Sequence, residues 1–162
     1  RDPEHYLQYQ NEGVAQYEKG NLEAAEAAFR KGVQRKRDAT LLNNLAHVIL
    51  TRRGDLPEAL ALINEAMRRQ PGLAGLFTTR GEIHMAMGRF SDARADYQTA
   101  LRKKGWDAEL LFRLVQSYAG LGDRTRMAAL ARSLRAREGT LTENQRQRLE
   151  ELEARLRGAV RL

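Results

Sequence analysis

The chain has 162 residues and is 42% apolar, so it can bury the core of one ordinary domain. It has no cysteine, which excludes disulfides, thiolate metal sites and thiol catalysis. The net charge of +7 comes from 28 basic and 21 acidic residues. Such a charge suits an anionic partner, but its spread along the chain favours solvated, arginine-rich helix faces.

No apolar run reaches the length of a membrane span, and no secretory or transit signal is visible. The sequence therefore predicts a soluble domain without a transmembrane segment. Both the cytoplasm and the periplasm remain open as compartments.

Helical periodicity predicts an antiparallel pair of helices over 4–19 and 22–36. Gly20 suits the left-handed backbone that ends a helix, and Asn21 is expected to cap the next one. One face of the first helix is marked by residues at helical spacing: Tyr6, Tyr9, Gly13 and Tyr17.

Three further pairs are predicted over 40–53 with 56–70, 73–87 with 90–103, and 107–121 with 124–137. In the second pair Asp55 is the expected cap and Pro57 fits the first turn. Ser91 or Arg89 stands at the junction of the third pair, and the fourth is entered through Gly122 and Asp123.

A ninth helix is predicted over 143–158, where Thr142 and Gln145 have the spacing of a capping box. Its apolar stripe consists of Leu149, Leu152, Leu156 and Val160. No strand-like alternation interrupts the chain, so the predicted fold class is all-α.

The pairs repeat with a period of 34 residues, which indicates a repeat protein. The shared landmarks are the glycines Gly20, Gly54, Gly88 and Gly122, the alanines Ala25, Ala59 and Ala93, the bulky residues Phe29, Ile63 and Tyr97, and the small residues Gly32, Ala66 and Ala100. Small residues, with Gly13 and Gly81 on first helices, should let the two backbones approach. The bulky residues are expected to fill the seam with the following repeat.

This pattern resembles the tetratricopeptide repeat, which implies a right-handed α-solenoid of about four repeats in a single domain, 1–162. The repeats would be 7–40, 41–74, 75–108 and 109–138, with a capping helix over 142–158. The fourth repeat departs from the pattern at Met127, Ala131 and Leu134, and His47 and Val115 stand where Gly or Ala is usual.

Two interpretations of the start of the chain remain open. Pro3 lies two repeat lengths before Pro71, which, with Arg1 in place of Met, indicates a fragment of a longer protein. Alternatively, Asp2 caps the first helix and Pro3 occupies its first turn.

The resemblance implies that first helices line a concave groove able to hold a peptide or protein segment. The alternative is that contacts lie on an edge or on the convex face. The predicted groove residues are Gln10, Val14, Tyr17, Asn44, Val48, Thr51, Arg52, Thr78, Glu82, Met85, Phe112 and Gln116.

Some members of this family grip the C-terminal carboxylate of heat-shock chaperones with Lys, Arg and Asn. None of the side chains at the corresponding positions of this chain is a charged donor, so that function is not expected. These positions hold Gln10, Val14, Leu45, Gly75 and Thr79.

Enzyme chemistry, metals and cofactors are not expected. His5, His47 and His84 lie on different repeats, and the carboxylates of Glu150, Glu151 and Glu153 have arginines within one turn. No phosphate-binding loop or nucleophile motif is present.

Trp106 is expected to pack across the turn between the third and fourth pairs, with an interface anchor as the alternative. The arginine-rich segment 124–162 lacks stacking aromatics, so a solvated cap is favoured over a nucleic-acid surface. The predicted function is a non-enzymatic adaptor that binds a protein or peptide. A self-associating scaffold, or an anion-binding module using the arginine-rich end, is the alternative.

Overall fold

The computed structural model describes residues 5–158 and contains nine α-helices, one short 3-10 turn and no strand within that range. The prediction of an all-α fold is therefore confirmed. The helices are α1 His5–Glu18, α2 Leu22–Arg35, α3 Ala39–Thr51, α4 Leu56–Arg69, α5 Ala74–Ala86, α6 Phe90–Lys104, α7 Ala108–Gly120, α8 Arg124–Arg135 and α9 Glu143–Gly158, with η1 at Glu138–Thr140.

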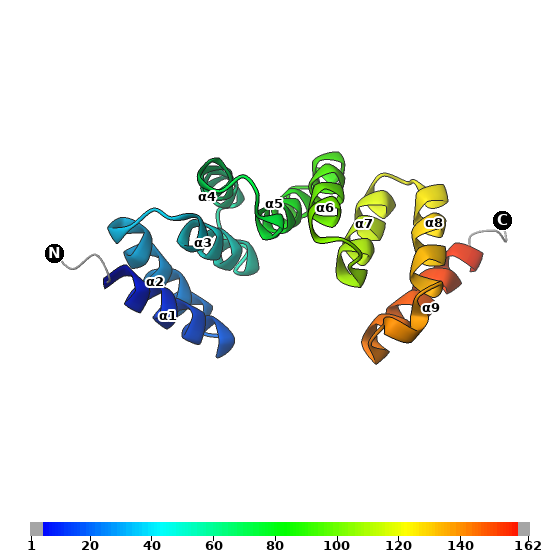
Figure 1. Cartoon of the computed structure of the whole chain (residues 1–162), viewed down its shortest axis with the longest axis horizontal. Helices are drawn as coiled ribbons and strands as arrows, with labels where there is room; N and C mark the ends of the chain where they lie inside the picture. Colours follow the sequence, from blue (N-terminus) through cyan, green and yellow to red (C-terminus); the bar gives the residue numbers. More distant parts are fainter. Residues whose placement is uncertain (1–4, 159–162) are drawn as a thin grey trace.

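The helices form a curved row of antiparallel pairs (Figure 1). Each odd-numbered helix packs on the even-numbered helix that follows it, and each even-numbered helix packs on the next pair. In Figure 1, α4 and α6 lie on the outer side of the arch, while α3, α5 and α7 lie toward its hollow side. Every helix boundary falls within two residues of its predicted position.

Aspartates cap four of the helices, because each carboxylate accepts a hydrogen bond from a backbone N–H of the first turn. These caps are Asp38, Asp55, Asp107 and Asp123. The prediction for Asn21 is wrong, since its side chain donates to Gln16 Oε1 at 2.9 Å and caps nothing. The capping box before α9 is confirmed: Thr142 and Gln145 exchange hydrogen bonds between side chain and backbone.

Three of the four turn glycines adopt positive φ angles, between 69° and 79°: Gly20, Gly88 and Gly122. The second repeat differs, because α3 ends one residue earlier and Arg53 takes the left-handed position with φ 55°. Gly54 is therefore not at the equivalent bend. A left-handed backbone costs a residue with a side chain more than it costs glycine.

Glycine and aromatic residues fit together inside two helix pairs. A Cβ atom on Gly13 would stand 2.4 Å from the Phe29 ring, and one on Gly81 would stand 2.5 Å from the Tyr97 ring. The two rings thus lie over a glycine of their own repeat rather than only in the seam with the next. At the equivalent positions of the other two repeats, the sequence has a larger residue on the first helix and a smaller one on the second: His47 with Ile63, and Val115 with Ala131.

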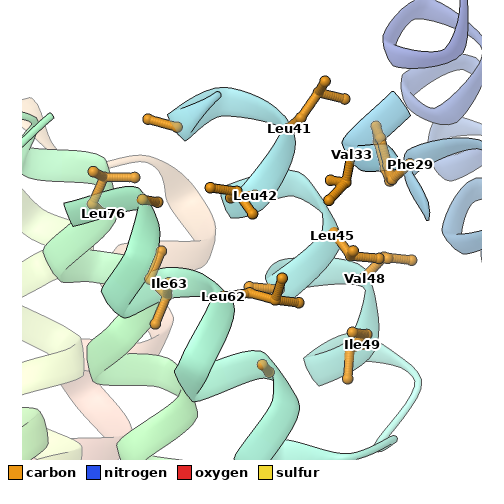
Figure 2. Packing of buried hydrophobic residues seen from close by; sticks show 14 of the residues in the cluster. Phe29, Val33, Leu41, Leu42, Leu45, Val48, Ile49, Leu62, Ile63 and Leu76 are labelled. Carbon is orange, nitrogen blue, oxygen red and sulfur yellow. The ribbon is translucent and has the colours of Figure 1, made fainter. Parts of the chain in front are cut away.

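The buried apolar residues form two clusters, one from α2 to α5 and one from α6 to α9. Figure 2 shows Leu45 of α3 between Val33 of α2 and Leu62 of α4. A polar group lies beside the join of the two clusters, where Arg80 donates two hydrogen bonds to Asp96, at 2.6 and 2.9 Å. Asp96 is only 4% exposed, so this ion pair crosses the α5–α6 contact inside the protein.

Candidate functional site on the inner face

The hollow side of the arch is lined by α1, α3, α5, α7 and α9, and we call this surface the inner face (Figure 1). Its first half is rich in hydrogen-bonding groups. The Tyr17 hydroxyl lies 3.4 Å from Thr51 Oγ1, and the Tyr17 ring lies 5.4 Å from the His47 ring. His47 Nε2 in turn lies 3.7 Å from Glu82 Oε2.

The second half of the inner face is charged. Glu82 pairs with Arg113 of α7, and Arg113 Nε lies 3.8 Å from Glu109 Oε1. Arg148 of α9 donates to Glu109 at 2.7 Å, and its guanidinium group lies 4.2 Å above the ring of Phe112. A continuous series of side-chain contacts therefore joins all five helices of the inner face.

A small cleft opens between α7 and α9 at the end of this series. Its floor is apolar, and its rim carries charged and amide groups that could fix the position of a ligand. The lining residues are Phe112, Val115, Gln116, Arg148, Glu151, Leu152 and Arg155.

The structure brings several of the predicted groove residues to the inner face but not all of them. Val48 is completely buried in the core, so its assignment to the groove is wrong. The reason is that α3 is covered by neighbouring helices on both sides, whereas Val14 at the same repeat position on α1 is 39% exposed. Phe112 is 4% exposed and lies beneath the guanidinium group of Arg148.

Some of the remaining predicted residues are held by contacts within the protein, and others are not. Arg52 turns toward Glu23 and Glu26 of α2, so it belongs to the edge of the array rather than to the groove. Met85 accepts a hydrogen bond from Ser117 at 3.4 Å, and Thr78 donates to the backbone of its own helix. Four predicted residues are exposed or half-buried and form no such hydrogen bond or ion pair with the described part of the chain: Gln10, Val14, Asn44 and Gln116.

Four members of the inner face were not predicted from the sequence: His47, Glu109, Arg113 and Arg148. Glu109 and Arg113 are four residues apart on one helix, and this spacing was visible in the sequence. The part played by Arg148 was not visible, because it depends on α9 lying beside α7.

The described residues contain no cluster of three or more side chains that could hold a metal ion. His84 is buried beside Asp96, with 3.7 Å between His84 Nε2 and Asp96 Oδ2, and burial lowers its pKa. Among the residues from 5 to 158, no helix is long and apolar enough to cross a membrane.

The arginine-rich end is largely tied to its own structure. Arg135 pairs with Glu153 at 2.6 Å, and Arg124 donates to the backbone oxygen of Leu156 at 2.9 Å. The guanidinium group of Arg137 covers the Trp106 ring at 5.0 Å. Val160 and Arg161, as well as Asp2 and Pro3, lie outside the described residues.

Fold and inner face together define a helical-repeat scaffold of the kind that binds other molecules along one surface. The family model described as a tetratricopeptide repeat-like domain matches residues 11–118. The chain belongs to this family, as the 34-residue period of its sequence predicted. A search of the curated proteins found no match to the sequence.

Solved structures agree on the fold. A thermophilic tetratricopeptide repeat protein of Thermus thermophilus superimposes with a TM-score of 0.75 at 23% identity, over 95% of this chain and 82% of that one. The first such domain of human RPAP3 gives a TM-score of 0.70 at 19% identity, over 75% and 95%. The first such domain of Spaghetti, solved with the HSP90 peptide SRMEEVD, also gives 0.70 at 19% identity, over 75% and 96%.

Proposed function

We propose that this protein is a non-enzymatic interaction module, which holds a peptide or protein segment along its inner face and so helps to assemble a complex. The observation that carries the proposal is the unbroken series of polar and aromatic side chains from α1 to α9. Relatives with the same fold bind peptides, including HSP90 and HSP70 peptides.

The chemistry of the inner face suits an extended or helical segment with mixed side chains. Tyr17, Asn44 and Gln116 present hydroxyl and amide groups that can pair with a peptide backbone. The α7–α9 cleft is an apolar depression at one end, which suits a single apolar side chain of the ligand. Most inner-face charges already have partners, so binding there should depend little on salt.

The proposal is tested with a peptide selected on the wild-type protein from a random display library. Its affinity is then measured for an inner-face triple variant, Tyr17→Ala, Asn44→Ala and Gln116→Ala. Phe112 is left intact, because emptying a buried aromatic site would cost about 3–5 kcal/mol of stability. We expect the triple variant to bind at least tenfold more weakly.

The matched control carries three polar-to-alanine changes at exposed positions of even-numbered helices: Gln34→Ala, Ser91→Ala and Ser133→Ala. The control should bind within about twofold of wild type. Equal loss in both variants, or undiminished binding by the inner-face variant, would contradict the inner face as the binding surface.

A further inference from the structure

The net charge of the chain gathers on one edge of the array. Because the helices alternate in direction, every loop from an even-numbered to an odd-numbered helix lies on the same edge. We call this surface the basic edge and define it as residues 31–40, 65–74, 99–108 and 133–142. It carries eleven Arg and Lys residues and four Asp and Glu residues, which leaves seventeen of each sign for the rest of the chain.

The opposite edge provides an internal comparison. Its four turns, residues 17–26, 51–60, 85–94 and 119–128, contain seven basic and seven acidic residues. The arginine-rich composition therefore does not distribute charge evenly. Only one edge is strongly positive.

The four carboxylates of the basic edge are all engaged. Asp38 and Asp107 cap helices, and Glu138 pairs with Arg135 at 2.8 Å. Glu65 is held by Arg37 and Arg69, and hydrogen bonding to Arg37 lowers the pKa of Glu65 to about 2.

Seven cations of the basic edge form no ion pair within residues 5–158, and all seven side chains are exposed. A cation in the last turn is favourable for the helix dipole, but that effect does not account for three consecutive basic residues at the end of α6. The seven unpaired residues are Lys31, Arg35, Lys36, Arg68, Arg102, Lys103 and Arg137.

Aromatic rings hold several of these cations in place. Lys36 Nζ lies 4.2 Å from the centre of the Tyr6 ring, and Lys103 Nζ lies 5.6 Å from that of Phe77. The Arg137 guanidinium group covers Trp106 in the same way. Bases of a single-stranded nucleic acid would have to displace these cations in order to stack, whereas carboxylates need only approach them.

We infer that the basic edge is a second interaction surface, separate from the inner face, which binds an extended acidic segment of a partner polypeptide. Charge complementarity carries this assignment: seven unpaired cations follow one edge through all four repeats, and a chain of carboxylates can reach them without rearranging the rings.

The test uses a fluorescein-labelled peptide of twelve glutamates, which extends to about 40 Å, with anisotropy measured at about 50 and 200 mM salt. The edge variant is Arg35→Gln, Arg68→Gln and Lys103→Gln. Its matched control, Lys19→Gln, Arg53→Gln and Arg89→Gln, removes the same charges from exposed, unpaired positions on the opposite edge. Both variants therefore have the same net charge.

Wild type and control should bind the peptide with affinities within threefold of each other, and binding should weaken at the higher salt concentration. The edge variant should bind at least tenfold more weakly. Equal loss in both variants would show a net-charge effect and overturn the assignment, as would failure of wild type to bind at low salt. Tighter binding of a twelve-nucleotide oligothymidylate than of the peptide would overturn it in favour of nucleic acid.

Discussion

At the scale of single residues, the second repeat keeps the period of 34 while moving its bend by one position. Arg53 occupies the left-handed backbone that glycine occupies in the other three repeats. A Cβ atom added to the neighbouring Gly54 would lie 3.2 Å from Ile49 Cγ2, so the absence of a side chain at Gly54 allows close packing. The 34-residue period predicts a bend at this glycine, but it does not distinguish which of the two adjacent residues adopts the left-handed backbone.

Replacing Arg53 with glycine should therefore stabilise the protein by roughly 0.5–1 kcal/mol, because the relief of the left-handed backbone exceeds the added freedom of the unfolded chain. Urea unfolding followed by circular dichroism measures the change. As a control, Gly88→Ala places a side chain in the same conformation and should destabilise. A less stable Arg53→Gly variant would contradict the assigned turn.

Two glycines of α5 provide a second residue-scale prediction. Gly81→Ala should cost roughly 1–3 kcal/mol, because its Cβ would meet the Tyr97 ring at 2.5 Å. Gly75→Ala meets no atom within 4 Å and should stabilise the helix by up to about 1 kcal/mol. Thermal and urea unfolding of both variants check the pair, and effects of the same sign would refute the packing described for Tyr97.

At the scale of helices, α5 and α6 hold the buried polar group that lies beside the two apolar clusters. His84 lies in this group with Asp96 and Arg80, and Asp92 and Arg89 are nearby in the surrounding cleft. Burial is the main cause of its lowered pKa, since it disfavours the charged imidazole. The folded state therefore binds a proton on His84 less readily than the unfolded chain does.

This difference predicts that the free energy of unfolding falls as the pH drops through about 6.5, the ordinary histidine pKa, because the unfolded state then takes up more protons. His84→Gln should reduce the decline between pH 7.5 and 5.5. Parallel pH profiles for wild type and His84→Gln, measured by urea unfolding, would rule out this role of His84.

At the scale of the whole molecule, the helices and their order could be predicted from the sequence, because the signals for helix starts, ends and packing recur every 34 residues. The members of the inner face could be predicted less well. Val48 has the periodicity of a groove residue but lies in the core, since burial depends on how many helices surround α3. Arg148 joins the face through contacts with α7, where its partner Glu109 is 39 residues away in the chain.

The residues of the inner face also predict a peptide that it does not bind. The HSP90 peptide SRMEEVD binds the first tetratricopeptide repeat domain of Spaghetti. In a titration of this protein to about 1 mM peptide, the amide resonances of Tyr17, Thr51 and Gln116 should remain unchanged. No cation stands at the corresponding positions, and Leu45 and Thr79 there are buried. Saturable shifts on α1, α3 and α5 would prove this expectation wrong.

Binding along the inner face is tested most directly by mapping a display-selected peptide on the protein by amide chemical shifts. We expect the shifts to fall along α1, α3, α5, α7 and α9, to include Tyr17, Thr51 and Gln116, and to persist at high salt. Shifts confined to the even-numbered helices, or to the basic edge alone, would contradict the inner face as the site where this protein holds its partner.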